Sequence, residues 1–189
     1  MTVLMPPGNY TVKLSVDGQE VGSQPLQVMI DPNSGGSEAD VAAQTAMLMA
    51  LRKDLEAAAD MTNQIEIIRG QLASLRQVVT DATVKAGADD LDKKLTDIED
   101  NLIQRKFSGQ GQDTTRFPNK LIAKITYLAG GVSGGDYPPN TQQQEVKSMF
   151  EAQLVDLRKR LDVVVSTDVA SFNRMLRDKG VGNVIAGGQ

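Results

Sequence analysis

The first thirty residues of the chain alternate between apolar and polar side chains, whereas the remainder does not. Side chains of a β-strand point to opposite faces in turn, so this alternation predicts two strands, each with one apolar face. Between them, Asp17-Gly18 tolerates the positive φ angles of a tight hairpin turn. Pro25 cannot donate a hydrogen bond to a neighbouring strand, so it marks a bulge or an edge. The alternating apolar residues are Tyr10, Val12, Leu14 and Val16 in the first strand and Leu26, Val28 and Ile30 in the second.

A hairpin of this kind needs something to cover it. A lone two-stranded sheet is marginally stable in water because its apolar face stays exposed. The hairpin either packs on the helices that follow, or is the last hairpin of a β-sandwich whose other strands lie upstream. The strand and turn pattern favours the second arrangement.

Helical periodicity begins at Ser37, which is a candidate N-cap, and Asp40 lies where the helix dipole favours acids. Apolar residues then recur every three or four positions to about Thr80. No proline interrupts this run, and only Gly70 weakens it, by about 1 kcal/mol relative to alanine. The spacing predicts one helix of roughly 65 Å, at 1.5 Å per residue, with a seam that faces other helices.

Three further helices are expected after this one. The segment "KAGADD" breaks the pattern, and Asp89 is the candidate N-cap of the second helix. Pro118 suits the first turn of a third helix, which "AGGVSGGDYPPN" ends. Thr141 and Gln144 form a candidate capping box for a fourth helix that runs to about Asp178.

The fourth predicted helix has two further features. Ser166 and Thr167 are candidate positions for a kink, and Gly180 ends the helix. The residues after Gly180, "GVGNVIAGGQ", are predicted to form a frayed tail.

The lengths of these elements predict the fold class. The chain is expected to be mainly α, an antiparallel helical bundle with two long and two short helices, preceded by a β-hairpin. The predicted organisation is a hairpin in residues 1–32, a linker in 33–37, the bundle in 38–180 and a flexible tail in 181–189.

The amino-acid composition excludes several kinds of functional site and partner. The chain has no cysteine, which excludes disulfides and thiolate metal sites, and no histidine, the commonest general base near neutral pH. A net charge of −4 argues against a nucleic-acid partner. No stretch approaches the length of an apolar membrane span, and the first residues do not resemble a secretory signal peptide. The sustained helical seam suggests a protein partner or self-association through the helices.

Clustered acids in the second predicted helix are a candidate divalent-cation site. They are Asp89, Asp90, Asp92, Asp97, Glu99 and Asp100. They lack the spacing and central glycine of an EF-hand loop, so a helix N-terminus with a solvated face explains them better. A solvated face also explains Arg158-Lys159-Arg160 better than an anion site does.

Two other features have simple structural explanations. The glycine-rich turn before Tyr137 lacks the Gly-Lys-Ser/Thr of a phosphate-binding loop. Five methionines are more easily explained as filling a helical core than as lining a groove. They are Met47, Met49, Met61, Met149 and Met175. We therefore assign no catalytic, cofactor-binding or metal-binding residue and expect no cofactor.

Several phrases of the sequence, taken in order, resemble a known family. They are "PPGNYTVKLSVDGQEVGSQPLQVMIDP", "LRKDLEAAADMTNQIEIIRGQLASL", "LDKKLTDIEDNLIQ" and "FPNKL" followed by "PPNTQQQEV". The resemblance is to the C-terminal end of bacterial sortilin-like, BNR-repeat proteins, which are long secreted chains often labelled glycosyl hydrolases. Members carry a β-propeller, an Ig-like segment and a helical tail. The resemblance spans nearly the whole chain but contains no catalytic signature.

The resemblance implies that the hairpin ends an Ig-like sandwich and that the protein is extracellular or periplasmic. It also implies a non-catalytic C-terminal accessory module, acting as a spacer or a protein-interaction bundle. The alternative is a free-standing cytoplasmic coiled-coil adaptor. A weaker third hypothesis is an enzyme that uses carboxylates on the helices.

Overall fold

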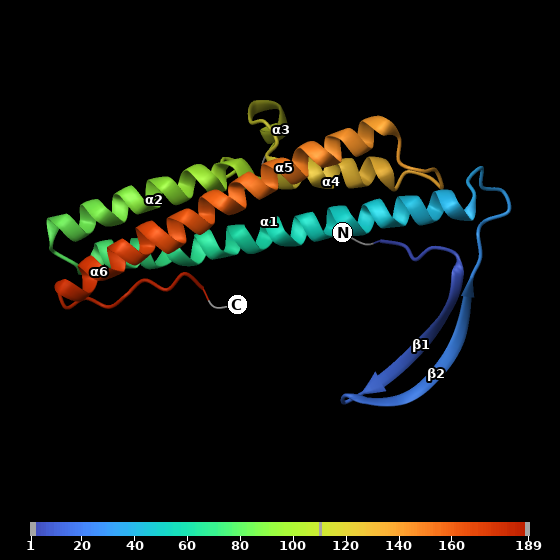
Figure 1. Ribbon diagram of the computed structural model, residues 1–189, viewed down its shortest axis with the longest axis horizontal. Helices are drawn as coiled ribbons and strands as arrows, with labels where there is room; N and C mark the ends of the chain where they lie inside the picture. Colours follow the sequence, from blue (N-terminus) through green and yellow to red (C-terminus); the bar gives the residue numbers. More distant parts are fainter. Residues whose placement is uncertain (1–2, 110, 188–189) are drawn as a thin grey trace. The chain divides into compact units, whose positions relative to one another are not determined.

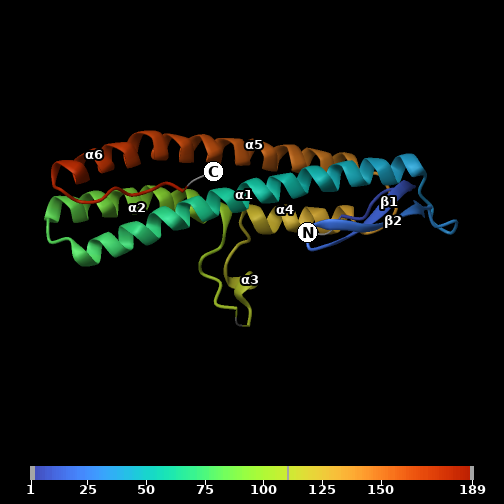
Figure 2. The same cartoon turned by 90° about the horizontal axis from the view of Figure 1, so that it is seen from below.

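The computed structural model describes residues 3–109 and 111–187, and it contains a β-hairpin followed by helices (Figure 1). The elements are β1 (Gly8–Val16), β2 (Gln19–Val28), α1 (Glu38–Val78), α2 (Ala82–Leu102), α3 (Asp113–Arg116), α4 (Leu121–Val132), α5 (Thr141–Val163), the π-helical segment η1 (Val164–Val169) and α6 (Ala170–Asp178). The predicted fold class, mainly α with a preceding hairpin, is confirmed. Figures 1 and 2 show α2 running antiparallel to residues 54–78 of α1 and 148–163 of α5.

The chain divides into two compact units. The first runs to Lys53 and adds Thr126–Lys147, so it contains the hairpin, the start of α1, most of α4 and the start of α5. The second contains Asp54–Ile125 and the chain from Ser148 onward, with α2, α3, η1, α6 and the remainder of α1 and α5.

The second unit is built on apolar seams with the spacing of a coiled coil. In α2 the buried apolar residues follow alternating steps of four and three positions. An average step of about 3.5 residues keeps the seam facing its neighbours. They are Val84, Ala88, Leu91, Leu95, Ile98 and Leu102. The same steps run through α1, where Ala58, Met61, Ile65, Ile68 and Leu72 are fully buried. Aliphatic packing therefore holds this unit together, as the sequence predicts.

The π-helical segment η1 keeps a third seam in register. The buried residues continue from Leu161 of α5 to Val164 at the start of η1, and the next buried residue is Val169, five positions later instead of three or four. A π-turn accommodates one extra residue in a helix, so Val169 returns to the buried side without a break. The predicted kink at Ser166 and Thr167 is therefore a π-turn inside one continuous helical run, Thr141–Val163, Val164–Val169 and Ala170–Asp178.

The hairpin forms as predicted. Asp17 has φ of 50° and Gly18 has φ of 80°, the two positive values that a tight hairpin turn requires. The strands pair antiparallel, with Tyr10 opposite Leu26 and Lys13 opposite Ser23. The register shifts between Leu14 and Ser15, so the bulge lies there and not at Pro25, which sits instead on an edge.

The start of α2 differs from the prediction. Asp81, not Asp89, is the N-cap, and its Oδ1 accepts hydrogen bonds from the backbone N–H groups of Thr83 (2.8 Å) and Val84 (3.1 Å). The segment "KAGADD" lies inside the helix. The absence of a side chain at Gly87 lets α6 pack closely on α2, because an added Cβ would lie 2.9 Å from Met175 and 3.0 Å from Phe172 of α6.

Two other helix ends also differ from the prediction. The capping box of α5 is made by Asn140 and Gln143, not by Thr141 and Gln144. The Asn140 N–H donates to Gln143 (3.0 Å), and the Gln143 N–H donates to Asn140 (2.8 Å). Helix α4 continues into the predicted glycine turn as far as Val132, and Nε2 of the buried Gln44 donates to the Val132 carbonyl at 2.8 Å.

The predicted helix ends at Ser37 and Gly180 are confirmed. The Asp40 N–H donates to the Ser37 hydroxyl (3.2 Å), and the Ser37 N–H donates to the Asp40 carboxylate (2.9 Å). Gly180 has φ of 68°, and the Val181 N–H donates to the Leu176 carbonyl at 2.9 Å, which is a Schellman motif.

Two helical glycines are expected to respond differently to substitution by alanine. Gly70 faces open space, so Gly70→Ala should raise the free energy of unfolding by about 0.5–1 kcal/mol through helix propensity alone. Gly87→Ala should raise the free energy of unfolding by less than this or lower it, because Phe172 and Met175 must move to make room for the added Cβ. Urea unfolding of both variants measures the difference. A Gly87→Ala variant at least as stable as Gly70→Ala would contradict the close packing of α6.

Candidate functional site

Salt bridges join α1 and α2 along the acidic face of α2. Arg69 Nε lies 2.8 Å from Asp92, and Arg69 also pairs with Glu99. Arg76 lies 3.2 Å from both Asp89 and Asp92. The predicted acid cluster is thus brought beside two arginines of α1.

The remaining acids of the cluster are paired as well. Asp90 lies 3.6 Å from Lys93, Asp97 pairs with Arg160 of α5, and Asp100 lies 3.5 Å from Arg105. Within the described ranges, no group of three or more acidic side chains is arranged to hold a metal ion. The cluster therefore provides counterions for arginine and lysine, and the cation-site hypothesis has no geometric support.

Glu99 is the most buried charge of this network, with a side chain that is 2% exposed. Arg69 and Arg105 both contact it, the latter at 3.3 Å. A buried carboxylate without partners would be strongly unfavourable. Glu99 can therefore lie at the edge of the α2 seam because these two guanidinium groups pair with it.

The arginines also set the titration of Asp92. Burial alone would raise the pKa of this carboxyl, but the hydrogen bonds and charges of Arg69 and Arg76 outweigh burial and lower the pKa below its ordinary value of 3.8. The ionised form is therefore favoured in the folded protein.

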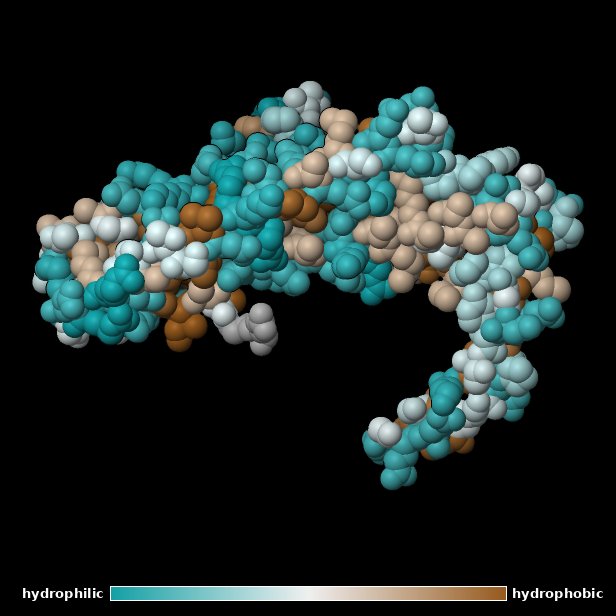
Figure 3. All heavy atoms as spheres, viewed as in Figure 1, coloured by the Kyte–Doolittle hydropathy of each residue, from teal (hydrophilic) through white to brown (hydrophobic). Residues whose placement is uncertain are grey.

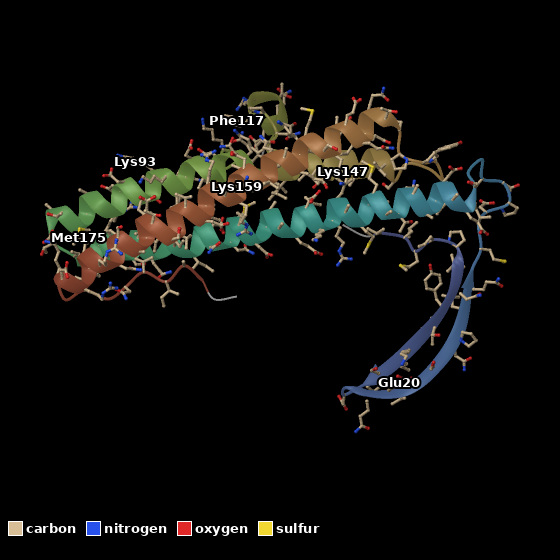
Figure 4. All side chains as sticks on the ribbon, viewed as in Figure 1. Glu20, Lys93, Phe117, Lys147, Lys159 and Met175 are labelled. Carbon is tan, nitrogen blue, oxygen red and sulfur yellow. The ribbon has the colours of Figure 1, made fainter. Side chains whose placement is uncertain are left out.

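Other candidate side chains are not gathered into one site. In the basic run of α5, Lys159 extends into solvent (Figure 4), Arg158 lies 4.0 Å from Asp162, and Arg160 pairs with Asp97. Of the five methionines, Met47 and Met61 are buried, Met175 is half-buried, and Met49 and Met149 are exposed. Core filling is confirmed for the buried pair only.

The hairpin presents a second candidate surface. Its apolar side chains are largely exposed, and Figure 3 shows hydrophobic atoms at its surface. The exposed fractions are 54% for Val12, 61% for Leu14, 52% for Val16 and 48% for Leu26. Both strands of the two-stranded sheet also carry an unpaired edge. The hairpin thus offers apolar side chains and main-chain hydrogen-bonding groups together.

A third candidate surface is the cleft between α1 and α6, which holds the C-terminal segment 181–187. The carboxamide of Asn173 accepts from the Val184 N–H (2.7 Å) and donates to the Val184 carbonyl (2.8 Å). The carboxamide of Gln71 makes the same pair of bonds with Ile185, at 2.8 and 2.7 Å. Gln64 donates to the Ala186 carbonyl at 3.0 Å.

Comparison of the chain with protein-family models, curated proteins and solved structures finds no match. In the part of the chain that the structure describes, no helix has both the length and the apolarity needed to cross a membrane. The family resemblance stays a prediction.

The cleft corrects the prediction of a frayed tail. Residues 184–186 are hydrogen bonded to side chains of α1 and α6, and Val184 is only 5% exposed; residues 188–189 lie outside the described part. Sequence reasoning missed this site because Gln64, Gln71 and Asn173 lie far from the tail in sequence and have no motif. The isolated Val184-Ile185 pair in a glycine-rich tail was the available signal.

The pKa of Asp92 gives a test of the salt-bridge network. Because its folded-state pKa lies below the unfolded value near 3.8, its stabilising contribution is present above about pH 4 and lost as the pH falls through the folded pKa. Asp92→Asn should therefore be less stable than the wild type at pH 7, and the two should converge at acid pH. Urea unfolding from pH 7 to pH 2 measures this.

The control for this test is Asp156→Asn, which changes an exposed carboxylate on α5. It should follow the wild-type curve closely at every pH. A constant difference between Asp92→Asn and the wild type down to pH 2 would show that the arginine pairs do not favour the charged form.

Proposed function

We propose that this chain is a non-catalytic accessory module of a secreted BNR-repeat protein, with a helical bundle that serves as a spacer or a protein-interaction surface. The observation that carries the proposal is the hairpin, a sheet of two strands with an uncovered apolar face. In the proposal, the hairpin belongs to an Ig-like β-sandwich supplied by a longer chain.

The two faces of the hairpin support a sandwich. Residues opposite one another in an antiparallel pair share a face, so Tyr10, Leu26 and Val12 lie on one side. Lys13 and Ser23 lie on the other. In β1 the side chains of Tyr10, Val12 and Leu14 thus form an apolar side opposite Thr11 and Lys13, although Gln24 of β2 lies opposite Val12. A strand with one apolar side is the pattern of a sandwich strand, whose inner side packs on a second sheet.

The strand edges support the same conclusion. Unpaired N–H and C=O groups along an edge are a template for adding another strand, and proteins generally cover such edges. Further strands would satisfy the edges and bury the apolar face at once. Packing on a helix would bury the face but leave the edges unpaired.

The ion-paired acids of α2 favour a non-catalytic role. Hydrolysis of a glycosidic bond commonly uses two carboxyl groups on either side of the bond, with one held protonated as an acid. In this chain Asp92 and Glu99 face arginines, and the pKa of Asp92 is lowered, opposite to what a general acid needs.

Hydrogen exchange tests the proposed role of the hairpin. In the isolated chain, edge amides of β1 and β2 should exchange rapidly; in a longer chain that includes the upstream strands they should become protected. Leu14→Thr should weaken that protection, because Leu14 is on the apolar face, whereas Ser23→Thr on the polar face should not. Equal exchange in both chains would contradict the sandwich.

The upstream reading frame separates this proposal from its rival. A frame that continues upstream into further strands and propeller repeats supports the accessory module. A stop codon in frame before Met1 with no such coding sequence would overturn it and favour the free-standing coiled-coil adaptor.

A second expected result concerns catalysis. The isolated chain should show no turnover of aryl glycosides above a buffer blank, because its paired carboxylates are counterions of arginine. Asp92→Asn and Glu99→Gln should lower the stability measured by urea unfolding, and the rate of aryl glycoside hydrolysis should stay at the level of the buffer blank. Reproducible turnover that either substitution abolishes would show the third hypothesis, an enzyme, to be correct.

A further inference from the structure

The cleft between α1 and α6 binds the main chain of its occupant from both sides. In an extended chain, the N–H and C=O groups of consecutive residues point in opposite directions. Val184 directs both groups to Asn173 of α6, and Ile185 directs both groups to Gln71 of α1. Each carboxamide supplies one donor and one acceptor, so it pairs with a residue as a neighbouring strand would.

The cleft selects few side chains of its occupant. Val184 is buried, with 5% of its surface exposed, whereas Ile185 is 67% exposed. The main-chain bonds do not depend on the sequence of the occupant. Recognition therefore requires an extended backbone and one small aliphatic side chain, and it tolerates variation at the next position.

The occupant is joined to the protein through glycines. Gly180 has φ of 68° and Gly187 has φ of 84°, and Gly182 lies between Gly180 and Val184, the first residue bonded to a side chain of the cleft. In the described residues the side-chain hydrogen bonds of the segment involve only Val184, Ile185 and Ala186. Such a segment can leave the cleft without unfolding a helix.

The cleft is also longer than these three residues. A hollow of about 720 Å³ lies where residues 181–184 face Glu66, Gln71 and Ser74 of α1. A second hollow, of about 630 Å³, lies beside Ala186 and Gly187 and is lined by Asp60, Asn63 and Arg158. Polar side chains in both hollows are placed to contact a longer peptide.

We propose that this cleft is a binding site for an extended peptide with a valine-sized aliphatic residue at the position of Val184. The chain's own segment 184–186 is the resident occupant, and a peptide of the same chemistry replaces it in trans. The site is separate from the hairpin and does not depend on the role proposed for the hairpin.

The test uses the full chain with Val184→Asp, which places a charge at the buried position and releases the resident segment. The probe is a fluorescently labelled peptide with the sequence of residues 181–187, measured by anisotropy. The variant should bind the peptide at least tenfold more tightly than the wild type, whose own segment competes at high effective concentration. A peptide with aspartate at the valine position should not bind, and one with lysine at the isoleucine position should bind within about threefold.

A matched pair of second substitutions identifies the site. Adding Gln71→Ala to Val184→Asp should weaken peptide binding at least tenfold, because both bonds to one residue are lost. Adding Gln77→Ala, an exposed glutamine on the same helix, should leave binding unchanged. No peptide binding by Val184→Asp, or equal binding with and without Gln71→Ala, would overturn the proposal.

A second measurement covers the case in which Val184→Asp does not fold, as judged by circular dichroism. In the wild-type chain, the Val184 and Ile185 amides should be protected from hydrogen exchange and should lose protection as unlabelled peptide is added to millimolar concentration. Protection that is unchanged at that concentration would show that the segment is a fixed part of the fold.

Discussion

The aliphatic seams of α1, α2 and the α5–α6 run are the packing on which the second unit depends. Their 3.5-residue spacing lets each helix keep one side against its neighbours over many turns. Leu95, Ile98 and Leu161 are essentially inaccessible to solvent at these seams. Where the spacing shifts by one residue before Val169, the π-helical turn restores the alignment, so the local backbone has adapted to the packing.

The polar groups beside the seams take their roles from this packing. Arg69 and Arg76 lie on the side of α1 that faces α2, so the acids there become their partners. Glu99 is tolerated in a buried position only because two guanidinium groups meet it. The acidic face of α2 thus contributes to helix pairing through ion pairs with α1 and α5.

Two surfaces remain that offer main-chain recognition, one in each unit. The hairpin presents free strand edges and exposed apolar side chains such as Leu14. The α1/α6 cleft presents the carboxamides of Gln71 and Asn173 to an extended segment. Both surfaces offer groups that can pair with the main chain of a peptide.

The sequence alone determined the elements that depend on local chemistry. The hairpin turn at Asp17-Gly18, the helix start at Ser37 and the helix end at Gly180 follow from near neighbours, and the periodicity predicts the helical class. Tertiary structure decided the rest. The role of Gly87, the pairing of the α2 acids and the position of segment 181–187 depend on residues far away in sequence, and no local pattern encodes which distant groups will meet.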